Sequence, residues 1–191
     1  MSARLTRSSR ISTVVCGLVL AIGLGGCGKT NHPPTGENNG VYVNAGPVTY
    51  QLQISRELNQ YATEDRQYIT GLPAAQGALV HGQEWYGVFL WAKNQTNKPQ
   101  VTSGNFDIVD TQGKHYYPLA VNPALNPYAW TARALQPNGT EPGADTTASF
   151  GPTQGSLLLF KLDNSIYDNR PLTLEIRGPQ RQLWGTVSLD L

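Results

Sequence analysis

The most constraining feature of the sequence is the run Trp85–Ala92, in which every residue is apolar or glycine. A strand with apolar side chains on both of its sides belongs in the middle of a sheet that is covered on both faces. The run therefore predicts the central strand of a layered β protein. On this interpretation Trp85 and Trp91 are both core residues.

Shorter runs alternate apolar and polar residues, the pattern of a half-buried strand. In the first long run Val48, Tyr50, Leu52 and Ile54 are expected to share the core face. Further strands are expected at 41–43, 106–109, 115–117, 146–150, 157–162, 172–176 and 187–191, with a hairpin loop at 110–113. About eight or nine short strands at this spacing predict an all-β, two-sheet antiparallel sandwich.

The segment Ser55–Leu72 breaks the alternation between two of these strands. Thr63 is a suitable N-cap for a short helix, and Glu64 and Asp65 follow in the first turn, where the helix dipole favours acidic side chains. We therefore expect a short helical excursion that is held to the core by its apolar residues.

The N-terminus combines three basic residues, Arg4, Arg7 and Arg10, with an apolar stretch from Ile11 to Leu24. The stretch is shorter than the ~20 apolar residues that cross a bilayer, so it is typical of a secretory signal peptide. Its end, Leu24-Gly25-Gly26-Cys27, resembles the bacterial lipobox. That resemblance implies cleavage after residue 26 and attachment of membrane lipid to Cys27, and two or more acyl chains make such attachment stable. The alternatives are an ordinary secretory signal with an incidental cysteine, or an uncleaved membrane anchor.

The domain organisation follows from that cleavage site. Residues 1–26 are the expected signal peptide, residues 27–40 a flexible tether rich in Pro, Gly and Asn, and residues 41–191 the sandwich domain. The mature chain would lie on the extracytoplasmic side of the cell membrane. It has 165 residues (191 minus 26), with 11 basic and 13 acidic side chains and a net charge of −2, which argues against a nucleic-acid partner. Because Cys16 lies in the signal peptide, Cys27 has no partner for an intrachain disulfide.

Catalytic and metal-binding patterns are weak in this sequence. The histidines are His32, His81 and His115, and the pair His81 and Glu84 does not supply the three or four ligands of a zinc site. No Gly-x-Ser-x-Gly motif occurs, although a spatial triad leaves no such trace. The oxygen-rich stretch Asp163–Asn169 lacks the glycine and the final Glu of an EF-hand and is better interpreted as a turn. We therefore predict no catalytic residue, no metal and no cofactor.

The long segment Pro118–Pro142 holds five prolines and should be irregular but stiff. Tyr128 and Trp130 lie within it. Exposed loop aromatics often mark a binding patch, so these two residues are the candidate binding residues. The alternative is that they fold back and cap one open end of the sandwich.

Several scattered residues carry a family resemblance: Val88 to Asn94, Pro99, Phe106, Asp110, Gly113, Tyr117, the stretch 135–140 and Phe150. Over roughly residues 82–176 the chain resembles a bacterial extracytoplasmic family described as telokin-like, whose sandwich is also seen in a secreted mycobacterial immunoprotective antigen. The resemblance implies an immunoglobulin-like sandwich. Because that family has no known function and this fold hosts many unrelated functions, the resemblance implies nothing about mechanism.

Together these features lead us to expect a membrane-anchored lipoprotein that acts as a non-catalytic module and binds a protein or an envelope component. One alternative is a carrier of a small apolar or sugar ligand. A second is an enzyme whose site the sequence does not display.

Overall fold

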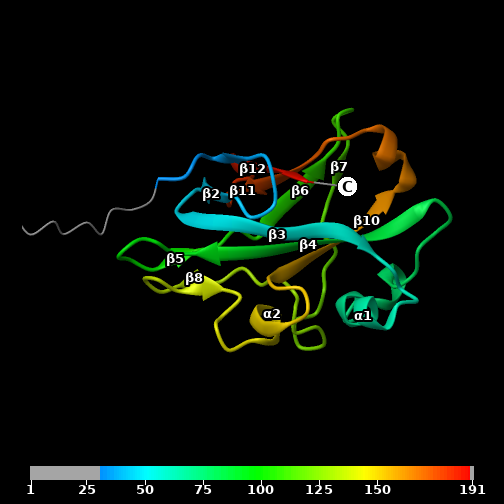
Figure 1. Ribbon diagram of the computed structural model, residues 1–191, viewed down its shortest axis with the longest axis horizontal. Coiled ribbons are helices and arrows are strands. Elements are labelled where there is room, and N and C mark those ends of the chain that lie inside the picture. Colours follow the sequence, from blue (N-terminus) through cyan, green and yellow to red (C-terminus); the bar gives the residue numbers. More distant parts are fainter. Residues whose placement is uncertain (1–30, 190–191) are drawn as a thin grey trace, which may run out of the picture.

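The computed structural model describes residues 31–189, which form a β-sandwich with short helices outside its sheets (Figure 1). The predicted signal peptide and the predicted lipid-attachment residue Cys27 lie outside the described residues. Among residues 31–189 no helix is both long enough and apolar enough to cross a membrane.

Two sheets make up the sandwich, and a small ribbon completes it. Sheet A has the order β1-β12-β11-β6-β7, and the strands are Thr35–Gly36, Leu183–Leu189, Leu172–Arg177, Asn105–Val109 and His115–Tyr116. Sheet B has the order β10-β4-β3-β2, and the strands are Ser156–Asp163, Gln83–Lys93, Val48–Leu58 and Tyr42–Ala45. The short strand β9 (Thr140–Glu141) also pairs with β4, and β5 (Gln100–Val101) pairs with β8 (Ala134–Leu135).

The predicted all-β, two-sheet antiparallel sandwich is confirmed. The run Trp85–Ala92 lies within β4, which is flanked by β10 on one side and β3 on the other. The main core fills the space between the sheets and includes Tyr50, Leu90 and Phe106, each almost fully buried. Among residues 31–189 the pairs of named strands are antiparallel except the edge pair β1–β12, and the isolated bridge between Ala129 and Leu157 is also parallel.

A second apolar cluster covers part of the outer face of sheet B. Short helices and the long loop after β7 lie on this side of the sandwich, away from sheet A (Figure 1). The helices are α1 (Thr63–Arg66), η1 (Gln67–Ile69), η2 (Ala74–Gln76) and α2 (Thr147–Phe150), while η3 (Asn164–Asp168) follows β10. The cluster contains Trp85, Phe89 and Leu157 from the sheet and Tyr68 and Tyr128 from the covering segments. The double-sided apolar character of β4 is therefore explained by two cores, one on each side of sheet B.

The excursion expected between β3 and β4 is present, with its helix at α1. Its N-cap is Ala62 rather than Thr63. Asp65 anchors it instead, because its carboxylate accepts two hydrogen bonds from Arg56 on β3, at 3.1 Å and 2.6 Å. The hydrogen bonds from Arg56 hold the pKa of Asp65 below its usual value.

Two local expectations were wrong. Ile54 does not share a face with Leu52, because a bulge at this point of β3 shifts the register and turns Ile54 toward the second cluster. The alternation Thr146, Ala148, Phe150 forms the helix α2 and not a strand, and Phe150 is 75% exposed. A run of five residues is too short for apolar spacing alone to distinguish the two structures.

The expected tether meets the sandwich earlier than residue 41. Residues 35–36 form β1, which adds to sheet A beside β12. The carbonyl oxygens of Pro33 and Pro34 accept hydrogen bonds from Asn44 of β2 and Thr186 of β12, at 3.1 Å and 2.9 Å. This segment therefore bridges the edges of the two sheets, and residues 33–36 belong to the domain.

Candidate binding face on sheet B

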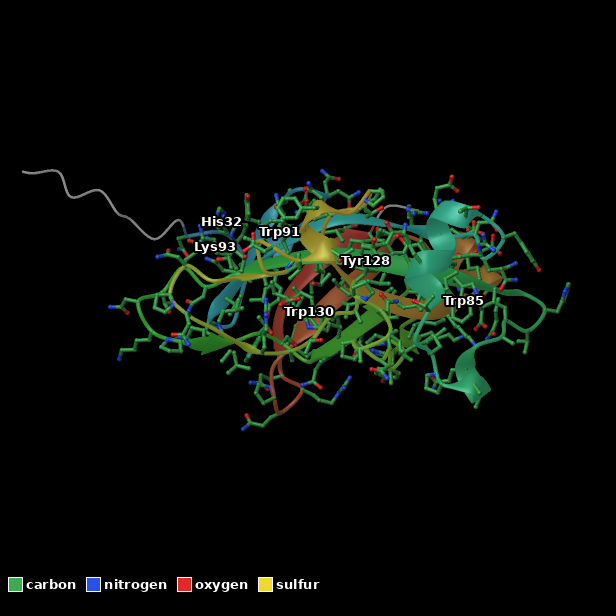
Figure 2. All side chains as sticks on the ribbon, turned by 90° about the horizontal axis from the view of Figure 1, so that it is seen from below. His32, Trp85, Trp91, Lys93, Tyr128 and Trp130 are labelled. Atoms are coloured by element: carbon green, nitrogen blue, oxygen red, sulfur yellow. The ribbon has the colours of Figure 1, made fainter. Side chains whose placement is uncertain are left out.

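The covering segments leave one half of the outer face of sheet B open. Trp85 and Phe89 of β4 lie beneath the cover, whereas Trp91 is half-buried and Lys93 is exposed. Figure 2 shows Trp91, Lys93 and His32 together near the end where the described chain begins, with Trp85 at the opposite end. The open half is therefore a surface of the sandwich near its N-terminal edge.

Strand register fixes which side chains share this surface. Tyr42 of β2 pairs with Gln51 of β3, and Gln51 pairs with Trp91 of β4. Residues directly opposite each other in an antiparallel sheet point to the same face. The three side chains therefore form one row across the sheet.

A second row lies beside the first. Asn44 pairs with Thr49, Thr49 with Lys93, and Lys93 with Thr140 of β9. The Thr49 hydroxyl donates to the Asn44 side chain at 2.7 Å, which fixes the amide against the sheet. The first row thus has an aromatic side chain at each end and an amide between them, and the second row is polar throughout.

The two rows line two shallow depressions that share Thr49. One, of about 210 Å³, is lined by Tyr42, Thr49, Tyr50, Gln51, Trp91, Ala92, Lys93 and Thr140. The other, of about 330 Å³, is lined by Asn31, Asn44, Gly46, Pro47, Val48, Thr49, Gln95 and Thr96. We call the two together the sheet-B groove.

The N-terminal segment adds an aromatic wall to this groove. The His32 ring stacks on the Tyr42 ring with centroids 5.1 Å apart and planes inclined by 29°. The carbonyl oxygen of Gly40 accepts a hydrogen bond from the Gln51 amide at 2.7 Å. Residues 32 and 40, which the sequence assigned to the tether, therefore support the open face.

Charge and hydrogen-bonding capacity distinguish the groove from the rest of the surface. Of the side chains that line it, Lys93 alone carries a full charge, and none is a carboxylate. The indole Nε1 of Trp91 is buried and has no hydrogen-bond partner within the described part of the chain. By contrast, Trp85 donates to Gln60 at 3.3 Å and Trp130 to Ser103 at 2.9 Å.

The candidate binding residues Tyr128 and Trp130 lie elsewhere and point inward (Figure 2). Tyr128 is 5% exposed, stacks edge-on against Tyr68 at 4.8 Å and donates its hydroxyl to Gln67 at 2.7 Å. Trp130 packs edge-on against Phe106 of the main core at 5.4 Å. Both residues fold back onto the sandwich, but Tyr128 covers the outer face of sheet B rather than an open end, and neither residue lines the sheet-B groove.

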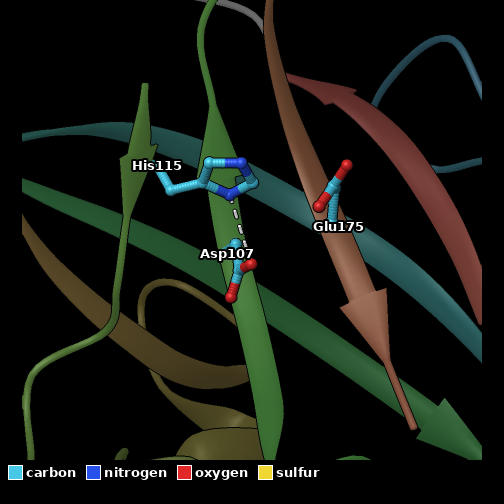
Figure 3. Close-up of side chains that lie close together, drawn as sticks. All are labelled: Asp107, His115 and Glu175. Carbon is cyan, nitrogen blue, oxygen red and sulfur yellow. Dashed lines mark ion pairs between the residues drawn. The ribbon is translucent and has the colours of Figure 1, made fainter. Parts of the chain in front are cut away.

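A second polar cluster lies on the outer face of sheet A. Asp107, His115 and Glu175 have potential ligand atoms within 4.8 Å of one another (Figure 3). However, Asp107 already accepts hydrogen bonds from Arg177 at 2.9 Å and from Arg181 at 2.6 Å, and Arg177 also pairs with Glu175. Two guanidinium groups so close to the carboxylates would repel a metal cation, so we interpret the cluster as an ion-pair network.

The remaining candidates from the sequence lie apart from one another. His81 is exposed before β4, and Asp163 ends β10, where it pairs with Lys114. The stretch after Asp163 forms the helix η3, so it is neither an open turn nor a loop of converging oxygen ligands. Near it, Glu84 is 8% exposed and accepts a hydrogen bond from the Tyr167 hydroxyl at 2.9 Å.

Sequence reasoning missed the groove because it assigned Trp91 to the core. Within a fully apolar run, alternation does not reveal which of two faces is left uncovered. The available signal was on the neighbouring strand, where Thr49, Gln51 and Gln53 alternate with core residues. A polar face on β3 implies that the adjoining positions of β4 are open as well.

Comparison with known proteins supports the fold alone. No family model matches the chain, and no curated protein matches its sequence. The crystal structure of the yjhA protein from Bacillus subtilis matches with a TM-score of 0.53 and 10% identity, over 81% of this chain and 99% of that one.

Two further structures are more distant. The ycdA protein of Bacillus subtilis, described provisionally as a lipoprotein, matches with a TM-score of 0.47 and 9% identity; the match covers 81% of this chain but only 39% of that one. An uncharacterized β-sandwich protein from Clostridium difficile matches with a TM-score of 0.42 and 9% identity, over 85% of this chain and 97% of that one. At these identities the shared feature is the β-sandwich fold.

Proposed function

We propose that the protein is a lipid-anchored extracytoplasmic module that binds a component of the cell envelope through the sheet-B groove. The observation that carries the proposal is the uncovered half of the outer face of sheet B, where Tyr42 is 47% exposed and Trp91 lines a depression. Aromatic side chains at the surface of a rigid sheet bind with little loss of conformational entropy. The lipobox-like sequence at Leu24–Cys27 supports the anchored location.

A binding role fits the groove better than a catalytic one. Its described lining contains no carboxylate, cysteine or histidine, and the nearby His32 ring is stacked on Tyr42. General acid–base or nucleophilic catalysis needs two such groups within hydrogen-bond reach. The groove instead offers amides, hydroxyls and aromatic rings, which are recognition groups.

The test is cosedimentation of the purified lipid-free chain, residues 28–191, with isolated cell envelopes. This fragment contains all of both apolar clusters, which draw only on residues 43–189. We expect the wild type to sediment with envelopes and Tyr42→Ala to remain largely in the supernatant.

The matched control is Tyr61→Ala, which removes a tyrosine that is 84% exposed in the excursion near α1. It should sediment like the wild type. If the wild type stays in solution, or if both variants lose binding equally, the groove is not the binding surface.

A further inference from the structure

We propose that the ligand of the sheet-B groove is a linear glycan of the cell envelope. This inference rests on the proposed function, because it names the class of molecule that the same groove binds. It is carried by the aromatic rings, the amides, the unpartnered indole N–H and the shape of the two depressions.

Sugar rings require two kinds of contact from a protein. Their C–H faces are apolar and pack on aromatic rings, while their hydroxyl edges both donate and accept hydrogen bonds. Tyr42 and Trp91 supply ring surface at the two ends of one row. Gln51 lies between them, and Thr49 and Thr140 lie alongside. Amides and hydroxyls are the side-chain groups that donate and accept together, as sugar hydroxyls do.

The indole N–H of Trp91 is a second, independent sign of a ligand. Buried donors in folded proteins are nearly always paired, and an exception calls for an explanation. Trp85 and Trp130 follow the rule, whereas Nε1 of Trp91 does not. Because Nε1 has essentially no exposed surface in the free protein, a ligand oxygen would supply the missing acceptor only if the side chains around Trp91 move aside on binding.

The shape of the groove favours a chain over a single sugar. The two depressions, of about 210 Å³ and 330 Å³, meet at Thr49. Because neighbouring strands are about 4.8 Å apart, Tyr42 on β2 and Trp91 on β4 have backbones roughly 10 Å apart, about the length of a disaccharide. A longer chain would continue past Asn44 toward Gln95 and Thr96.

Other occupants fit less well. With Lys93 as its one charged lining residue and no carboxylate, the groove has no group to pair with a cationic peptide. A peptide that adds a strand needs a free sheet edge, but Gln51 and Trp91 lie on inner strands of sheet B. On the edge strand β2, the backbone N–H of Asn44 already donates to Pro33 of the N-terminal segment. A lipid chain would need a continuous apolar lining, whereas amides and hydroxyls interrupt this one.

The experiment is titration calorimetry of residues 28–191 with chitotetraose, cellotetraose and mannotetraose, repeated with the full chain in detergent. We expect saturable binding of at least one tetrasaccharide. Trp91→Phe keeps an aromatic ring and removes the N–H, and we expect it to weaken binding by about tenfold. We expect a similar loss of affinity for Tyr42→Ala, which removes a ring. Tyr61→Ala should bind like the wild type, and unfolding midpoints establish that each variant is folded.

A second arm separates failure of this inference from failure of the proposed function. Before cosedimentation, envelopes are treated either with protease or with two glycan-degrading reagents together: periodate, which cleaves vicinal diols, and lysozyme, which hydrolyses β-1,4-linked N-acetylhexosamine chains that lack such diols. A glycan ligand predicts loss of binding after the glycan-degrading treatment and retention after protease. Binding that depends on Tyr42 but survives the glycan-degrading treatment, with no tetrasaccharide bound, would overturn the glycan while leaving the module intact.

Three other outcomes are also decisive. Absence of any envelope binding would remove both proposals. Binding to phosphatidylglycerol vesicles that Trp91→Phe abolishes would assign the groove to lipid headgroups. A Tyr42-dependent dimer in light scattering would assign it to a second copy of the chain.

Discussion

The indole N–H of Trp130 donates to the carbonyl oxygen of Ser103 at 2.9 Å, while the backbone N–H of Ser103 donates to the Tyr50 hydroxyl at 2.6 Å. Ser103, which lies just before β6, thus connects the long loop to the main core. Trp130 also stands 6.1 Å from the Tyr50 ring. The loop is held by a specific buried contact as well as by its prolines.

Trp130→Ala should therefore lower the free energy of unfolding by at most about 3–5 kcal/mol, the range for truncation of a fully buried tryptophan, because Trp130 is partly buried. Chemical denaturation measures this loss. Leu125→Ala in the same loop is the control, because Leu125 is 66% exposed and its removal should cost less than about 0.5 kcal/mol. Envelope binding by a folded Trp130→Ala protein should be unchanged. A stable variant that fails to bind would show that this loop takes part in binding.

Asp107→Ala should destabilise the sandwich by about 1–3 kcal/mol, because Arg177 loses its most deeply buried partner and keeps only its pair with Glu175. Arg181→Ala removes a side chain that is 50% exposed and should cost less than about 1 kcal/mol. Denaturant unfolding of both variants gives the comparison. An equal loss in the two would show that the network is not centred on Asp107.

The ion-pair network around Asp107 also predicts that metal ions do not change the stability of the protein. A cation that binds only the native state raises the unfolding midpoint by mass action. Because both carboxylate oxygens of Asp107 already face guanidinium groups, excess zinc should leave the midpoint of the wild type unchanged. A rise that His115→Ala removes would identify a metal site at this cluster.

Glu84→Gln should stabilise the protein at neutral pH. Burial raises the pKa of Glu84, although the hydrogen bond from Tyr167 opposes this effect. A carboxyl whose pKa is higher in the folded state stabilises the fold fully below its unfolded pKa, and that contribution is lost as the pH rises through the folded value.

Unfolding midpoints measured from pH 4 to pH 8 test this expectation. The wild type should lose stability over the upper part of that range relative to Glu84→Gln, which has no charge to bury and can still accept from Tyr167. Two parallel curves would show that Glu84 ionises in the fold at no cost. Tyr167, whose pKa burial raises to about 12, stays protonated throughout.

Cys27→Ala in the full chain should abolish acyl labelling in cells and leave an uncleaved precursor. The reason is that the thiol accepts the lipid and the lipobox-like sequence at Leu24–Cys27 precedes it. Metabolic labelling with a fatty acid, followed by electrophoresis, gives both readouts. Ser9→Ala, within the same signal peptide, should be labelled and processed normally; labelled, processed Cys27→Ala would refute the anchor.

The strands with clear patterns were predictable, and the groove was not. The run Trp85–Ala92 and the alternation of β11 identify buried strands directly, since each side chain on a pleated strand reports its own environment. The bulge near Leu52 could not be predicted from the sequence pattern. One extra residue in β3 moves the side chains that follow it to the opposite face of the sheet, yet the alternation of residue types is unchanged. Which half of the outer face of sheet B is covered depends on where segments distant in sequence, Tyr68 and Tyr128, come to pack.

The helix at 147–150 illustrates a different limit. Thr146, Ala148 and Phe150 satisfy a two-residue period, but backbone hydrogen bonds close a short helix between β9 and β10 instead. The candidate loop aromatics were correctly located in an irregular segment, and their burial follows from contacts with Gln67 and Ser103 that no local pattern encodes.

In the anchored protein that we propose, the bridge made by Pro33, Pro34 and β1 is the place where mechanical tension would enter the fold. In the described part of the chain, a two-residue strand and a few hydrogen bonds hold this segment. Under tension it would therefore detach before the two sheets unfold. Once released, residues 31–40 could span up to about 35 Å at ~3.5 Å per residue. The same movement would separate His32 from Tyr42 beside the groove, so that tension on the tether would alter ligand binding.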